Sequence, residues 1–158
     1  MKSLASALLV ALMVPYASAH EVSVNFDPTT VEDWSDTYGE REVSYLTDRV
    51  TRDISRALAN STLNIASIEV TILDAKPNRP TTQQASDRLG LDQFRSYSLG
   101  GMSLHAEAFN SEGVLVGDYA YRWFEKDIRL AAYSPTWGDA SRASDRFARQ
   151  FVRSLAED

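Results

Sequence analysis

The sequence predicts an α+β fold: two layers, with a mainly antiparallel sheet of about four strands and two helices on one face, ordered β-α-β-β-β-α. Three observations lead to this prediction. Four segments alternate apolar and polar residues, which is typical of half-buried strands. Two longer segments repeat apolar residues at steps of three and four, which is typical of amphipathic helices. Strands and helices do not alternate regularly along the chain, and this disfavours a parallel, doubly wound sheet.

The first nineteen residues have the pattern of a secretory signal peptide. Lys2 provides a positive start, residues 4–14 an apolar stretch, and Ala17, Ser18 and Ala19 a small-residue cleavage site. The apolar stretch is shorter than the roughly 20 residues that span a bilayer. We therefore expect residues 1–19 to be removed and residues 20–158 to form one soluble α+β domain without a transmembrane span.

The first half of that domain reads as a strand, a helix and a second strand. Residues 21–26 alternate, and Pro28 ends the pattern. Residues 27–42 form an acidic connection that contains Trp34 and Tyr38. An amphipathic helix is predicted over about 40–60, ending near Asn60. Its apolar face consists of Val43, Leu46, Val50, Ile54 and Leu58.

A second strand is predicted over 68–72, and the prolines of residues 77–80 then interrupt regular structure. Thr81 can cap a short helical turn that runs to Leu89. Residues 102–108 and 114–124 alternate again, and four turn residues ending in Gly113 join them. This arrangement predicts a β-hairpin.

The last element has the clearest helical period. Thr136 and Asp139 resemble a capping box at its start, with Asp in place of Glu. Phe147 and Phe151 lie on its apolar side, and we expect them to pack on the sheet face that carries Ile68, Val70 and Leu104. The aromatic side of the preceding strand is interpreted as core, with a stacking platform for glycans or peptides as the alternative. This side consists of Tyr119, Tyr121 and Trp123.

Composition excludes several classes of function. The chain has no cysteine, so disulfides, thiolate metal sites and cysteine nucleophiles are excluded. Its formal net charge is −6, and loss of Lys2 with the leader makes it one unit more negative. A net-acidic protein lacks the positive field that attracts phosphate backbones, so we expect no nucleic-acid partner.

Basic residues nevertheless align on one side of the last helix. Arg142, Arg146, Arg149 and Arg153 are spaced by four, three and four, opposite the Phe147 and Phe151 side. They are candidates for binding an acidic protein surface or lipid phosphates, together with Arg79 in the proline-rich loop. The alternative is a solvated face, because Asp145 can pair with Arg149.

Two further candidates concern histidines. Cleavage before His20 would expose an α-amine and an imidazole, a pair that suits Cu(II), and His105 is the other histidine of the chain. The alternative is that cleavage simply leaves a histidine behind. Ser103 and His105 share a strand face, but strand rise separates them by about 6.7 Å, too far for direct activation. A hydrolase of unknown class therefore remains without an assigned nucleophile, and we expect no cofactor.

Four motifs together resemble uncharacterised small secreted proteins of proteobacteria over most of the domain. They are residues 77–81 (PNRPT), Gly100-Gly101, residues 121–123 (YRW) and residues 136–139 (TWGD). The resemblance implies a bacterial envelope setting, hence the periplasm, and brings no activity with it. The element order is also similar to small periplasmic α+β accessory domains of outer-membrane assembly and transport systems, which is a likeness of fold only.

The sequence thus favours a soluble periplasmic binding or accessory protein without catalysis, which would contact an envelope protein or anionic lipid. Two alternatives remain: a secreted copper-binding protein that uses His20, and a periplasmic hydrolase.

Overall fold

The computed structural model describes residues 20–31, 33–59 and 61–157. The predicted signal peptide, residues 1–19, lies outside this part of the chain. Four strands form one sheet in the order β1-β2-β3-β4: β1 (Glu21–Phe26), β2 (Ser67–Lys76), β3 (Gly101–Phe109) and β4 (Leu115–Phe124). β1 runs parallel to β2, and the other two pairs are antiparallel. The sheet is thus mixed but mostly antiparallel, as predicted.

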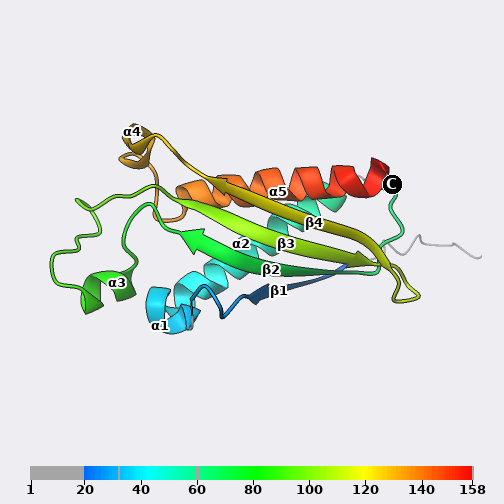
Figure 1. Cartoon of the computed structure of the whole chain (residues 1–158), viewed down its shortest axis with the longest axis horizontal. Coiled ribbons are helices and arrows are strands. Elements are labelled where there is room, and N and C mark those ends of the chain that lie inside the picture. The colour runs from blue at the N-terminus through cyan, green and yellow to red at the C-terminus, as the bar shows by residue number, and fades with distance from the viewer. Residues whose placement is uncertain (1–19, 32, 60, 158) are drawn as a thin grey trace, which may run out of the picture.

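Two long helices cover one face of this sheet, α2 (Glu40–Leu58) and α5 (Gly138–Glu157), and they pack against each other as well. Figure 1 shows the sheet in front of these helices, so the view looks onto its uncovered face. The predicted α+β class, element order and two-layer arrangement are therefore confirmed.

Three short helices complete the order, and two of them were not predicted. α1 (Trp34–Tyr38) lies in the acidic connection, where Asp33 accepts a hydrogen bond from the amide of Asp36. α4 (Ile128–Ala131) begins behind a similar aspartate cap, Asp127. α3 (Thr82–Asp87) was expected from Thr81, which forms a complete capping box with Gln84. Figure 1 shows α3 and α4 at one end of the molecule and the β3–β4 hairpin at the other.

The core lies between the sheet and the two long helices. Phe147 and Phe151 are fully buried and stack with ring centroids 5.8 Å apart, beneath the inward aromatic side of β4. Ile68, Val70 and Leu104 belong to the same buried cluster, as expected. The aromatic side of β4 is packed against this cluster rather than free, and this supports the interpretation as core.

The predicted cap of the last helix is wrong in detail. The amide of Asp139 donates to Oδ1 of Asn78, 61 residues earlier, at 2.9 Å, instead of taking part in a box with Thr136. Asp139 itself is fully buried inside the first turn of α5. A partner so distant in sequence cannot be read from local spacing, so the helix start is fixed by the tertiary structure. Among the described residues, no helix combines the length and apolar character needed to cross a bilayer.

Candidate functional site

The four sequence motifs meet at the end of the molecule that carries α3 and α4. Three of them, all but residues 121–123, meet at Asn78, which is completely buried. Its backbone amide donates to the carbonyl of Thr136 at 2.6 Å, and its carbonyl accepts from the amide of Ser98 at 2.8 Å. Three connections, those following β2, preceding β3 and preceding α5, are therefore joined through one residue.

The side chain of Asn78 forms a reciprocal pair with Asp139. Its Nδ2 donates to Oδ2 of Asp139 at 2.5 Å, while its Oδ1 accepts the Asp139 amide. The same carboxylate accepts from the amide of Gly100 at 3.3 Å and from Arg142 at 2.9 Å. A buried carboxylate is tolerated only when donors surround it, and here three different segments provide them.

The paired glycines of this region allow the close approach that Asn78 needs. A Cβ on Gly100 would lie 2.7 Å from Oδ1 of Asn78, inside the contact limit. Gly101 has φ of 155°, and a Cβ there would lie 2.4 Å from the carbonyl oxygen of Trp123. The Gly100-Gly101 motif therefore has a packing reason, since side chains at either position would push the β2 loop and β4 away from β3.

Arg79 acts as a second tie beside Asn78. Its guanidinium donates to four main-chain carbonyls, those of Ser134 (3.0 Å), Ala132 (2.6 Å), Phe94 (2.8 Å) and Gln93 (3.4 Å). Arginine has five N–H donors, so one remains after these four bonds. The structure thus fastens Arg79 between two loops and does not bring it together with the four arginines of α5.

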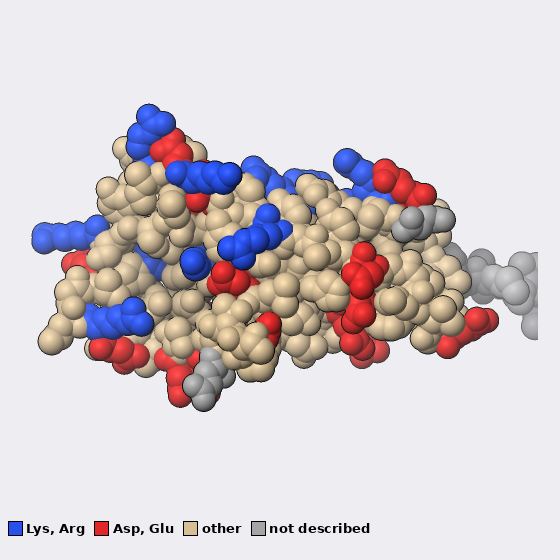
Figure 2. Space-filling model, viewed as in Figure 1, with Lys and Arg blue, Asp and Glu red and all other residues tan. Residues whose placement is uncertain are grey.

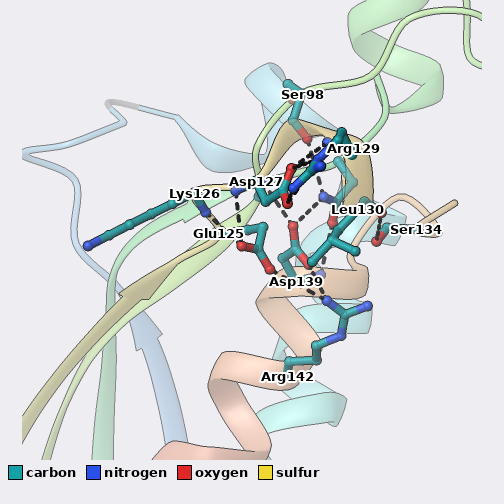
Figure 3. Close-up of polar contacts among 11 residues, drawn as sticks. Ser98, Glu125, Lys126, Asp127, Arg129, Leu130, Ser134, Asp139 and Arg142 are labelled. Carbon is teal, nitrogen blue, oxygen red and sulfur yellow. Dashed lines mark hydrogen bonds and ion pairs between the residues drawn. The ribbon is translucent and has the colours of Figure 1, made fainter. Parts of the chain in front are cut away.

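A group of charged residues surrounds the start of α5 and the short helix α4. Figure 3 shows Arg142 next to both Asp139 and Glu125, and Arg129 turned onto Asp127. Arg142 lies 4.0 Å from Oε2 of Glu125. The backbone amides of Lys126 and Asp127 lower the pKa of Glu125, and Arg142 lowers it further. The pKa of Asp127 is lowered as well, by its bonds with Arg129, so Glu125 and Asp127 brace the start of α4 as hydrogen-bonded carboxylates.

The same end exposes apolar side chains. Phe94 is 87 % exposed and Tyr133 is 92 % exposed, although large apolar groups are mostly buried elsewhere in the described residues. Both stand next to carbonyls that Arg79 holds, those of Phe94 itself and of Ala132, so they project from a fixed base. Leu130 on α4 is half exposed as well. Exposed apolar groups gathered on one part of a surface commonly mark an interaction site.

The predicted arginine side of α5 is exposed along its length and borders the edge strand β4; we call its four members the arginine stripe. Arg142 is bound to Asp139, and Arg149 to Asp145 at 2.5 Å. The guanidinium of Arg146 lies 4.5 Å from the ring centroid of Trp123. Among the described residues, no hydrogen bond or ion pair of Arg153 is found. The stripe thus combines anchored arginines with a more loosely held one near its end.

On the uncovered face of the sheet, the basic and the acidic side chains lie in different halves. Lys76 and Arg122 both lie over the ring of Phe124, at 5.7 and 4.7 Å from its centroid. Towards the hairpin, the register aligns Glu69, Glu107 and Asp118 in one row across three strands. Figure 2 shows the same separation, with most blue side chains over the half that carries α3 and α4 and a red band across the other half.

The structure does not bring the two histidines together. Nδ1 of His20 lies 2.7 Å from the carbonyl oxygen of Ile65, at the beginning of β1. His105 lies in the middle of β3, with Nε2 3.0 Å from Oδ1 of Asp118 on the uncovered face. His105 aligns with Thr71 and so with Asn25, five residues beyond His20, which corresponds to roughly 16 Å along the strand. Within the described residues, no group of three or more metal-ligating side chains occurs.

Sequence reasoning missed most of this end of the molecule. It singled out Arg79 and residues 77–81 but assigned Asn78 no partner, and it treated Asp139 as a local cap. The one available signal was the residue types themselves. Paired glycines at 100–101 and the TWGD motif at 136–139 are not typical of a regular strand or helix. The pairing of Asp145 with Arg149 was anticipated from their spacing and is present.

Comparison with known proteins shows no family for this chain. No family model matches the chain. No curated protein matches it either. Among solved structures it is similar to a putative lipoprotein from Caulobacter crescentus CB15, with a TM-score of 0.41 and 16 % identity over 89 % of each chain. At that level the likeness carries no argument, and the case for a function rests on the surfaces described above.

Proposed function

We propose that this chain is an exported, non-catalytic docking protein of the bacterial cell envelope, and that it binds an acidic protein surface through the arginine stripe. The observation that carries the proposal is the exposure of all four arginines on one side of α5 in a chain whose net charge is −6. A solvated helix face gains no stability from a row of positive charges, because like charges four residues apart repel.

The surroundings of the stripe support a protein partner. Its first member, Arg142, lies beside Glu125 just before α4, and Leu130 of α4 and Tyr133, two residues after this helix, are exposed. Arginine and tyrosine are the residues most enriched where protein interfaces bind tightly, and apolar groups beside them provide area to bury. The periplasmic setting comes from the leader pattern of residues 1–19, which lies outside the described residues.

The alternatives find less support. A copper site at His20 lacks its second histidine, because His105 is on another part of the sheet and faces Asp118. A hydrolase would need a nucleophile, a base and oxyanion donors that converge. Ser103 is buried on the sheet face next to His105, and no hydrogen bond joins them among the described residues.

The test compares three versions of the mature protein in capture from an envelope fraction. The stripe variant, Arg149→Glu with Arg153→Glu, reverses the two arginines whose partners are exposed or absent among the described residues. Arg142 is left intact, because a glutamate there would face the buried Asp139. The control variant, Arg41→Glu with Arg52→Glu, makes the same charge change on exposed positions of α2.

We expect a discrete protein to be captured by the wild type and the control and lost by the stripe variant. The interaction should also weaken about tenfold or more at roughly 0.5 M salt, where charges are screened beyond a few ångströms. Equal capture by all three would refute the stripe as the binding surface. Binding of the wild type to vesicles that contain phosphatidylglycerol, with the same dependence on the variants, would assign the stripe to lipid instead of protein.

A further inference from the structure

A hollow of about 330 Å³ lies between the two loops that Asn78 and Arg79 join. One side is formed by the connection after β2, including Pro77 and Pro80, and the other by the connection before β3, including Leu91 and Leu99. Tyr38 of α1 forms part of the lining too. The volume is at the lower end of the range seen for small-molecule sites, and the mixture of apolar walls with a few polar groups is typical of them.

The charges that line this hollow all have one sign. Lys76 and Arg79 are the ionisable residues of its wall apart from two tyrosines, and no aspartate or glutamate lines it among the described residues. The four bonds of Arg79 go to neutral carbonyls, and no ion pair of Arg79 is found within the described chain. The guanidinium charge is therefore held in place without a carboxylate to balance it, and one N–H donor is unused.

The loops that form the hollow are also preorganised by hydrogen bonds. Arg79 ties one wall, through the carbonyls of Gln93 and Phe94, to the segment before α5, through those of Ala132 and Ser134. Ser98 is fixed to the opposite wall by its bonds with Asn78 and with the carbonyl of Pro77. A ligand would thus pay little to order these loops, which favours the binding of a small molecule.

We propose that this hollow binds a small organic anion, a carboxylate attached to an apolar or aromatic body. The carboxylate binds the free N–H of Arg79 and draws in the ammonium of Lys76, which lies over the ring of Phe124 in the structure, and the body lies against Pro77, Pro80 and Tyr97. A hydrogen bond from the one free N–H of the charged guanidinium favours a carboxylate oxygen, and Lys76 adds a point charge at the rim. This binding is independent of the arginine stripe, which lies on another element.

The test uses the mature chain and a matched pair of probes, phenylacetate and phenylacetamide, which differ in charge and share the same ring. Amide chemical shifts are recorded by NMR while each probe is added up to about 10 mM, because probes of this size bind in the millimolar range at best. Lys76→Met removes one charge at an exposed position. Lys126→Met is the control, since Lys126 is exposed and does not line the hollow.

We expect phenylacetate to shift the amides of residues 76–79 and 91–99 and to bind about tenfold more tightly than phenylacetamide. Lys76→Met should weaken phenylacetate about fivefold and leave phenylacetamide unchanged, whereas Lys126→Met should change neither. The proposal is overturned if no shifts gather around the hollow, if the two probes bind equally, or if Lys76→Met binds phenylacetate as the wild type does. None of these results bears on capture by the arginine stripe, so the two proposals can fail separately.

Discussion

At the scale of single residues, two side chains hold one end of the molecule together in different ways. Asn78 uses its backbone and its amide to join three connections, and Arg79 joins two of the same segments through carbonyl oxygens. Both are neighbours in sequence, yet Asn78 is completely buried and Arg79 is only partly so. One therefore contributes chiefly to folding, and the other keeps a charged group available at a hollow.

Replacement of Asn78 by alanine should destabilise the fold strongly. The carboxylate of the buried Asp139 would lose its shortest donor, and the Asp139 amide would lose its acceptor. Each unsatisfied buried polar group costs about 1–3 kcal/mol, so we expect a loss of roughly 2–4 kcal/mol in urea unfolding. Asn64→Ala, at an exposed position, is the matched control and should change stability little. An unchanged unfolding midpoint for Asn78→Ala would mean that the reciprocal pair contributes nothing.

Tyr38 should ionise above the usual pH range of a tyrosine. Burial raises its pKa, the charge of Asp74 raises it further, and Arg88 opposes them in part. Below about pH 10 the Tyr38 phenol is protonated in both the folded and the unfolded chain. It therefore adds no pH dependence to the free energy of unfolding in that range. Above that pH the unfolded chain releases the proton first, and stability falls as the pH rises. In a titration followed at 295 nm, Tyr38→Phe should remove the most alkaline part of the curve and leave the earlier part unchanged.

At the scale of elements, the sequence predicted those segments whose pattern reflects one environment along their whole length. The helix over 40–60 and the strand over 21–26 agree with the structure because one side of each faces the core throughout. β2 continues to Lys76, four residues beyond the predicted strand, because a register shift near Leu73 breaks the alternation. α1 and α4 were missed because each has only one turn, which is too short for a helical period to show.

The contact between α2 and α5 includes a feature that no pattern could predict. Asp53 is buried between these helices and accepts from Ser144 and Arg49, both at 2.8 Å. Its other oxygen has no hydrogen-bond partner among the described residues. The apolar period of α2 identifies its buried face but does not predict a buried aspartate beside it. The polar contact of Asp53 between the two helices is therefore visible only in the tertiary structure.

Removal of one ring from the core tests the layer arrangement. Phe151→Ala takes away a fully buried side chain that stacks on Phe147 and lies under Tyr119. Such truncations typically cost about 3–5 kcal/mol, a large share of the stability of a small domain. Val152→Ala, one position on in the same helix and only partly buried, should cost clearly less. Equal losses for the two variants in thermal unfolding would argue against α5 packing through its phenylalanine side.

At the scale of the whole molecule, charge and apolar surface are distributed unevenly along the long axis. The end with α3 and α4 carries the braced loops, the hollow and the exposed aromatic groups, while the other half of the uncovered sheet face is acidic (Figure 2). The sequence showed the arginine stripe and the loop motifs separately. The placement of the loop motifs at one end, and the hollow between the loops, depend on bonds between residues about 15 to 60 positions apart.

Export is the remaining prediction at this scale. The pattern that ends in Ala17, Ser18 and Ala19 predicts that protein recovered from the periplasm begins with His20. Intact-mass measurement of that protein decides the matter directly. Recovery of a chain that retains Met1 and the apolar stretch would remove the basis for the periplasmic assignment, and with it the envelope partner of the proposed function.

The position of β1 in the sheet also predicts when this strand joins during folding. β3 and β4 pair across a tight turn, and β2 and β3 pair antiparallel from Lys76 and Gly101 onward, whereas β1 pairs in parallel with β2 across the whole of α2, Glu21 with Ser67. Contacts that close long loops form late in folding, because the entropy of closure must be overcome first. β1 should therefore join last and open first, and its amides should exchange with solvent before those of β3. The amino-terminal strand, although synthesised first, is thus the piece that completes the sheet.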